Sequence, residues 1–115
     1  IFPMEYWPLI RRHAAANKLD PFVVAALVAQ ESTFDPGAKS SANAVGLMQI
    51  VPSTGRQWAR KLRLGRFSAR SLTNPAVNVR IGTAYFADQV APRHMAFKLD
   101  IGDQQVKGLN IIAGK

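Results

Sequence analysis

The sequence predicts a single, mainly α-helical domain. Two steps, Asp20-Pro21 and Asn74-Pro75, each place an N-capping side chain directly before a proline, which is a preferred start of an α-helix. Both are followed by runs with apolar residues at helical spacing. The length of 115 residues suits one domain with one hydrophobic core.

The first two helices are expected over residues 8–17 and 21–35. A proline at the first position suits the first turn of each. The aromatic segment 1–7 is expected to pack on the domain as a terminal anchor. The second helix must end before Pro36, because a proline disfavours the helical conformation at the residue before it.

Two further helices are expected over residues 54–64 and 75–90. Ser53 is the expected N-cap of the third helix, Gly65 closes it, and Pro92 stops the fourth. The apolar stripe of the fourth helix is expected to be buried and consists of Ile81, Tyr85 and Phe86.

Between the second and third helices, residues 36–44 are rich in Gly, Ser, Ala and Asn and are expected to form a loop. The apolar segment 46–50 is too short to classify by its period. We expect it to be extended or a single turn, lining a cleft above Glu31. Beyond Pro92 the signal weakens, and the tail 93–115 has no assigned structure.

Glu31 is the candidate catalytic residue because it shares a helix face with Val24, Leu27 and Val28. An ionisable side chain in an apolar stripe is disfavoured as the anion, which favours a carboxyl that can donate a proton near neutral pH. The same position could instead hold a structural carboxylate that reaches solvent or pairs with an arginine. On spacing alone, both interpretations stay open.

Glycoside cleavage uses such an acid and usually a second carboxylate. Within the unit 31–50 the other acid is Asp35, which is expected to cap or brace the turn at the following proline. One carboxyl that acts as acid and then as base, with a nucleophile from the substrate, is therefore the economical hypothesis. Ser40 and Gln49 could bind sugar hydroxyl and amide groups, or could only stabilise the loop.

Other catalytic chemistries find little support. Ser32 has no histidine near it in sequence and lies in no Gly-x-Ser-x-Gly motif, so we expect it to bond the backbone at the helix end. The chain has no cysteine, and His13 and His94 show no metal-ligand spacing. We expect neither a metal nor a cofactor.

The net charge of +8 is unevenly placed. No Asp or Glu occurs between Pro36 and Ala87, where the basic residues are Lys39, Arg56, Arg60, Lys61, Arg63, Arg66, Arg70 and Arg80. Such a segment indicates nucleic acid, an acidic cell-wall glycan or anionic lipid as partner, or a solvated face without one. No run approaches the ~18 apolar residues of a membrane helix, so no integral membrane segment is expected.

Several motifs, taken together and in order, resemble one family. They are Tyr6-Trp7, Leu19-Asp20-Pro21, Glu31-Ser32, Phe34-Asp35-Pro36, Ser40, Gly46-Leu47-Met48-Gln49, Pro52-Ser53-Thr54 and Asn74-Pro75. This series is similar to the catalytic (SLT) domain of soluble lytic murein transglycosylases, in the goose-type-lysozyme-like superfamily. The similarity runs over about residues 2–90.

The resemblance implies a lysozyme-like helical fold and cleavage of the MurNAc-β-1,4-GlcNAc bond of peptidoglycan. It gives Glu31 the role of acid and then base, while the C6 hydroxyl of MurNAc closes a 1,6-anhydro ring. Ser40, Met48, Gln49 and Val51 would contact the sugars around that bond. The implied partner is the peptidoglycan glycan strand, and the implied location is the periplasm or cell envelope.

The sequence departs from the family after the fourth helix. The family continues with an Ala-Tyr-Asn motif whose tyrosine lies near the acid, and nothing in residues 91–115 matches it. Tyr85 occurs too early to take that role. We therefore expect a catalytic domain over residues 1–92, truncated or processed, and a divergent tail over residues 93–115.

Two alternatives remain. The first is a peptidoglycan-binding domain that lost catalysis together with the motif. The second is a basic nucleic-acid-binding module, which is disfavoured because the interval between the second and third helices far exceeds the short turn of a helix-turn-helix.

Overall fold

The computed structural model describes residues 4–91, which are mainly helical and contain no named strand. The elements in chain order are η1 (Met4–Tyr6), α1 (Trp7–Ala16), α2 (Pro21–Ser32), α3 (Pro52–Lys61), η2 (Ala69–Thr73) and α4 (Pro75–Gln89). The expected tail 93–115 lies outside the described residues. None of the helices between residues 4 and 91 is both long and apolar enough to cross a bilayer.

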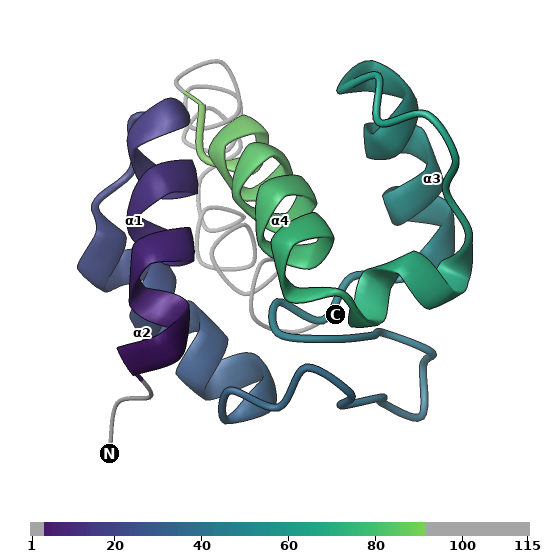
Figure 1. Cartoon of the computed structure of the whole chain (residues 1–115), viewed down its shortest axis with the longest axis horizontal. Helices are drawn as coiled ribbons and strands as arrows, with labels where there is room; N and C mark the ends of the chain where they lie inside the picture. The colour runs from purple at the N-terminus through teal and green to yellow at the C-terminus, as the bar shows by residue number, and fades with distance from the viewer. Residues whose placement is uncertain (1–3, 92–115) are drawn as a thin grey trace, which may run out of the picture.

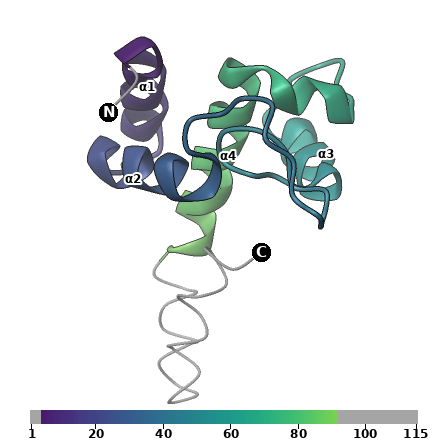
Figure 2. The ribbon, with the colours of Figure 1, turned by 90° about the horizontal axis from the view of Figure 1, so that it is seen from below.

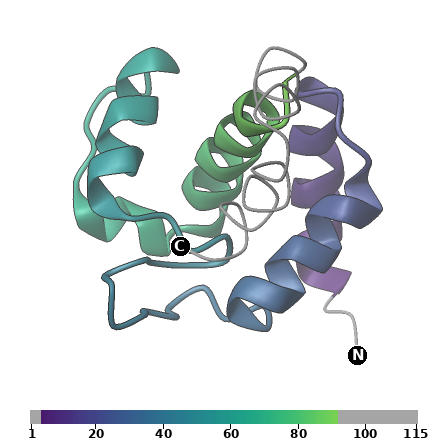
Figure 3. The ribbon, with the colours of Figure 1, turned by 180° about the vertical axis from the view of Figure 1, so that it is seen from behind.

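Helix α4 is the centre of the arrangement (Figure 1). Helices α1 and α2 lie on one side of it and α3 on the other, and the same order is seen from below (Figure 2). From behind, α2 crosses in front of α1, and the long α2–α3 loop runs past the lower end of α4 (Figure 3). Both α1 and α3 contact α4 directly, so α4 supports the two halves of the domain.

The two cap-plus-proline signals begin helices, as predicted. The carboxylate of Asp20 accepts a hydrogen bond of 2.8 Å from the backbone N–H of Phe22 at the start of α2. The side chain of Asn74 accepts one of 2.9 Å from Ala76 N–H at the start of α4. These bonds satisfy backbone donors that the first turn of a helix leaves without intrahelical partners.

The predicted boundaries of the third helix are wrong. Helix α3 begins at Pro52, and the cap position before it is Val51, with an extended backbone (φ −76°, ψ 148°) and no side-chain cap. Proline suits the first helical position because its φ is already helical and its missing N–H would have no intrahelical partner there, so Ser53 lies inside the helix and cannot be its cap. The helix ends at Lys61, before Gly65 is reached.

The core combines side chains from the helices with a buried segment of loop. Its largest fully buried aliphatic members are Ile10, Leu47, Leu72, Ile81, Val24, Val28 and Val79. Two aromatic contacts hold the N-terminal segment on the domain: Tyr6 stacks with Phe34 at 6.4 Å between ring centroids, and Trp7 packs on Phe22 at 5.1 Å. This confirms the predicted anchor over the part of residues 1–7 that the structure describes.

Candidate active site

Glu31 lies in the last turn of α2, on the apolar face that the sequence predicted. Val24 and Val28 on that face are fully buried, Glu31 itself is half-buried, and its Oε2 atom is shielded from solvent. The helix ends at Ser32, and the following residue, Thr33, adopts the left-handed conformation (φ 52°). Glu31 is therefore held at a helix end, with one carboxylate oxygen inside the protein.

The apolar segment 46–50 forms a single buried turn. The sequence left two alternatives for it, an extended segment or a single turn, and the second is correct. Residues 44–50 are all buried, and Val45 and Ile50 exchange two backbone hydrogen bonds of 2.9 and 3.0 Å. The hydroxyl of Ser32 donates toward the carbonyl oxygen of Leu47, 2.8 Å away. Because Ser32 follows Glu31, this contact fixes the catalytic candidate relative to the turn.

Asn78 of α4 attaches the same turn to the centre of the domain. Its Oδ1 accepts from the N–H of Met48 at 2.8 Å, and its Nδ2 donates to the carbonyl oxygens of Val45 (2.8 Å) and Leu72 (2.9 Å). The side chain is fully buried. Gly46 (φ +83°) lies so close that a Cβ there would meet Asn78 Nδ2 at 2.3 Å. The turn and α4 thus form one rigid unit.

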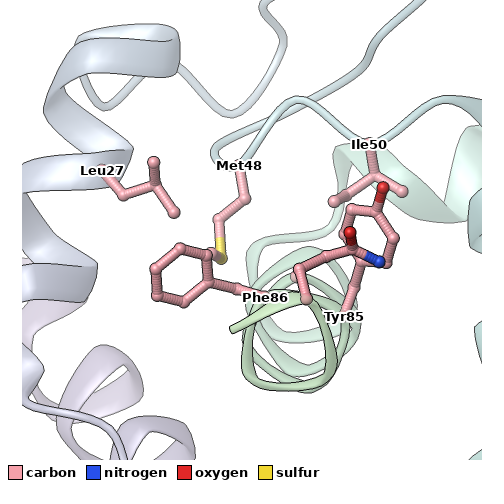
Figure 4. Close-up of a pocket in the computed structure, with 7 residues that line it drawn as sticks. Leu27, Met48, Ile50, Tyr85 and Phe86 are labelled. Carbon is pink, nitrogen blue, oxygen red and sulfur yellow. The ribbon is translucent and has the colours of Figure 1, made fainter. Parts of the chain in front are cut away.

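A mostly apolar pocket opens where α2, the buried turn and α4 meet (Figure 4). Its lining residues are Leu27, Met48, Ile50, Gly82, Tyr85, Phe86 and Gln89. Met48 extends from the turn toward α4, where Gly82 leaves room for it, since a Cβ at Gly82 would meet Met48 Sδ at 2.4 Å.

The predicted burial of the α4 stripe is only partly correct. Ile81 is fully buried, whereas Tyr85 and Phe86 are half-buried and line the pocket. Tyr85 also packs edge-on against Trp58 of α3, with ring centroids 6.3 Å apart. Aromatic side chains at the end of α4 therefore form a wall of the pocket instead of part of the core.

Glu31 stands one helical turn after Leu27 on the same face of α2; Leu27 lines this pocket, whereas Glu31 itself is not among the lining residues. No carboxylate lines the pocket among residues 4–91. The nearby Asp35 accepts a 2.9 Å hydrogen bond from Gly37 N–H, which braces the turn as the sequence predicted. Within α2, Glu31 is the acidic residue, and it lies on the helix face that carries the pocket residue Leu27.

Ser40 and Gln49 bond to the loop that carries them. The Ser40 hydroxyl oxygen accepts from the N–H groups of Ala42 (3.2 Å) and Ala44 (3.1 Å). The Gln49 side-chain N–H₂ donates to the carbonyl oxygens of Ala38 (3.1 Å) and Gly46 (3.0 Å). Gln49 is 5% exposed, and its amide oxygen takes part in neither bond.

Val51 lies apart from Met48. It lines a second, more open pocket beside the cationic residues Lys39 and Arg56, whereas Met48 lines the apolar pocket. Ile50 faces the first pocket and Val51 the second, so the chain passes between the two at this point. Of the predicted sugar contacts, Met48 and Val51 thus line different pockets, and Ser40 and Gln49 line neither of the two.

The basic side chains of the predicted segment are all exposed. Within the described part of the chain, no three His, Cys, Asp or Glu side chains gather as metal ligands would.

Asn78 and Gly82 organise the pocket, and neither was predicted from the sequence as a site residue. Both fall on the face of α4 that carries Ile81. A polar residue and a glycine on a buried helix face are a sequence pattern that indicates close contact between the helix and another segment of the chain. Their partner, the turn around Met48, lies 30 residues earlier in the chain. Local sequence patterns do not specify that pairing.

The chain is similar to a well-defined set of known proteins. The sequence profile of the family described as Transglycosylase SLT domain matches residues 8–93. Membrane-bound lytic murein transglycosylase C of Actinobacillus pleuropneumoniae is 42% identical over 85 residues, which are 72% of this chain and 23% of that protein. The protein of the same name from Haemophilus influenzae is 43% identical over 83 residues, which are 70% of this chain and 23% of that protein.

Solved structures of lytic transglycosylases share the fold. The 70 kDa soluble lytic transglycosylase of Escherichia coli matches with a TM-score of 0.74 and 27% identity, over 97% of this chain and 19% of that one. An inactive glutamate-to-glutamine mutant of lytic transglycosylase Slt from Pseudomonas aeruginosa matches with a TM-score of 0.76 and 26% identity, over 99% and 19%. The chain thus spans less than a quarter of the length of these relatives.

Proposed function

The chain belongs to the Transglycosylase SLT domain family, and from this premise we propose that it cleaves the MurNAc-β-1,4-GlcNAc bond of peptidoglycan as a lytic transglycosylase. Glu31 protonates the leaving oxygen. It then acts as base on the C6 hydroxyl of MurNAc, which closes a 1,6-anhydro ring without consuming water.

The observation that carries this proposal is the position of Glu31. The carboxyl has one oxygen shielded from water and stands one helical turn from the lining of an apolar pocket, a position from which a general acid could reach a bound glycan. Ser32 and Asn78 fix the helix end and the facing turn, so the carboxyl needs little reorganisation during the reaction. In the Pseudomonas relative, a glutamate-to-glutamine replacement gives an inactive protein.

Within residues 4–91, the roles of the other acids beside α2 support the single-carboxylate mechanism. Asp20 caps α2 and Asp35 braces Gly37, and both are exposed. Neither of these acids, nor Asp88, lines the apolar pocket. A hydrolase with two carboxylates would need the second one within about 5–9.5 Å of the first. The substrate itself therefore supplies the nucleophile in our proposal.

The second pocket supports binding of the glycan beyond the reacting sugar. Lys39 and Arg56 border it next to Val51, and peptidoglycan carries carboxylates on its peptide stems. The amide oxygen of Gln49 and the hydroxyl hydrogen of Ser40 are the groups that we assign to sugar contacts, because their other atoms already hold the loop. Such a substrate places the domain in the periplasm or cell envelope.

Mass spectrometry of digested sacculi tests this function. Released muropeptides should end in 1,6-anhydro-MurNAc, which is lighter by one water than the reducing end left by a hydrolase. Products with reducing ends alone would contradict the single-carboxylate mechanism and would point to a second acid.

A second candidate rests on the missing Ala-Tyr-Asn motif. A domain without that tyrosine could bind peptidoglycan but fail to cleave it. Saturable binding to sacculi with no released muropeptide would favour this alternative.

A further inference from the structure

A separate pocket lies on the face of α4 opposite the candidate active site. The apolar pocket uses Gly82, Phe86 and Gln89 of α4, whereas this one uses Ala76, Val77 and Arg80. At 3.6 residues per turn these two sets point to opposite sides of the helix. The pocket is lined by residues of α1 on one side and by residues of the segment 64–71 on the other, and Glu31 is not among its lining residues.

The lining of this pocket is cationic at its rim and apolar at its walls. Three guanidinium groups come from three separate parts of the chain: Arg12 from α1, Arg66 from the segment before η2, and Arg80 from α4. The lining also contains Ser71 and the apolar residues Leu64, Phe67, Ala76 and Val77. No carboxylate lines it among the residues that the structure describes. The arrangement brings cations together without providing an anion.

The walls of the pocket are held in place by contacts that do not involve the guanidiniums. Asn17, which directly follows α1, donates a 3.1 Å hydrogen bond to the hydroxyl of Thr83 in α4, and Ile10, Ala14 and Val79 belong to the core that joins these helices. On the other side, Ser68 N–H donates to Ser71 Oγ at 3.0 Å in a reciprocal capping box. The pocket is therefore formed before any ligand arrives, which lowers the entropic cost of binding.

His13 lies in the same lining and senses its charge. Burial lowers the pKa of His13, and the positive charges of Arg80 and Arg12 lower it further. The third guanidinium, that of Arg66, also lines the pocket. A bound anion would offset these charges and raise the pKa of the imidazole again.

We propose that this pocket binds the phosphate group of a phosphate ester through Arg12, Arg66 and Arg80. Guanidinium groups form forked, charge-assisted hydrogen bonds with phosphate oxygens. Three of them around one pocket match a multivalent oxyanion better than a single carboxylate. The organic part of the ester packs against Leu64 and Phe67. A soluble phosphate ester and an anionic lipid headgroup present this same chemistry.

The test follows the His13 ring by NMR in the whole chain while glycerol 3-phosphate is added. We expect a saturable shift and a raised pKa of His13. Arg80→Gln and Arg66→Gln should each weaken binding about tenfold, the scale for losing one charge-assisted contact. Arg60→Gln is the matched control, because Arg60 is an exposed arginine of α3 outside the pocket.

Two results would overturn the proposal. One is an equal loss of affinity in the Arg60→Gln control, which would show diffuse attraction instead of a site. The other is an absent shift, or the same shift with acetate at equal ionic strength.

Vesicles separate the two sources of phosphate. Binding to phosphatidylglycerol vesicles but not phosphatidylcholine vesicles, reversed by glycerol 3-phosphate, assigns the site to a lipid headgroup. Binding of glycerol 3-phosphate without vesicle binding assigns it to a soluble ester. Release of muropeptides should be unchanged in Arg80→Gln, so this test is independent of the proposed lytic activity.

Discussion

Replacing Asn78 by alanine should destabilise the domain more than the loss of any exposed cap. The wild-type side chain makes hydrogen bonds of 2.8, 2.8 and 2.9 Å to Met48, Val45 and Leu72, all of which are buried. A hydrogen bond contributes about 0.5–1.5 kcal/mol net, and a buried group left unsatisfied costs about 1–3 kcal/mol. Three such bonds give an expected loss of about 3–4 kcal/mol in the free energy of unfolding.

Urea unfolding of Asn78→Ala and of a matched control measures this loss. Asn74→Ala is the control, because Asn74 is the N-cap residue directly before α4 and also bonds backbone N–H groups, but at an exposed helix start. Its expected cost is about 1 kcal/mol, the usual value for an N-cap. Similar unfolding free energies for the two variants would refute the reasoning that the buried hydrogen bonds of Asn78 stabilise the fold more than the exposed cap of Asn74 does.

Three further predictions concern single side chains. Glu31→Gln should abolish release of 1,6-anhydro muropeptides with little change in the urea midpoint, because the isostere keeps the packing and loses the transferable proton; near-wild-type release would remove Glu31 from catalysis. Gln49→Ala should lower the free energy of unfolding and raise the activation free energy of turnover, each by about 1–3 kcal/mol. A lower melting temperature with unchanged turnover would show that Gln49 has a structural role only. The pKa of His13 is lowered in the folded state by burial and by Arg80 and Arg12, so the unfolded chain takes up a proton more readily. The free energy of unfolding should therefore fall as the pH drops below about 6.5, and His13→Gln should remove that part of the slope in urea unfolding on both sides of this pH.

The sequence predicted the fold wherever the signal was local. The caps Asp20 and Asn74 act on N–H groups two residues away, so both helix starts were correct. Ser32 was likewise expected to bond the backbone at the helix end, and its hydroxyl lies 3.1 Å from the carbonyl oxygen of Val28. Ser53 failed as a predicted cap because Pro52 begins the helix one residue earlier.

The site was predicted less completely because its geometry depends on distant pairs. The face occupied by Glu31 follows from helix periodicity, whereas the contact between Met48 and Gly82 depends on how the turn meets α4. Tyr85 was expected in the core, since an apolar stripe does not show whether its last turn is covered by another element. The assignments of Ser40, Met48, Gln49 and Val51 to the reacting sugar stay predictions.

The turn at residues 44–50 has no regular secondary structure, yet its backbone amides should exchange with solvent as slowly as those of a central helix. The N–H groups of Val45, Met48 and Ile50 all donate to buried partners, and the partner of Met48 is the side chain of a different element. The exchange rate of an amide depends on the free energy of the unfolding event that exposes it to solvent. Local unfolding of this turn alone cannot expose these amides, because their partners are buried in the core. Separating this turn from α4 would break the core, so the segment behaves as part of one cooperative unit with the helices. Loops normally open first, but this loop lines the apolar pocket, and that lining should be among the last parts of the domain to open.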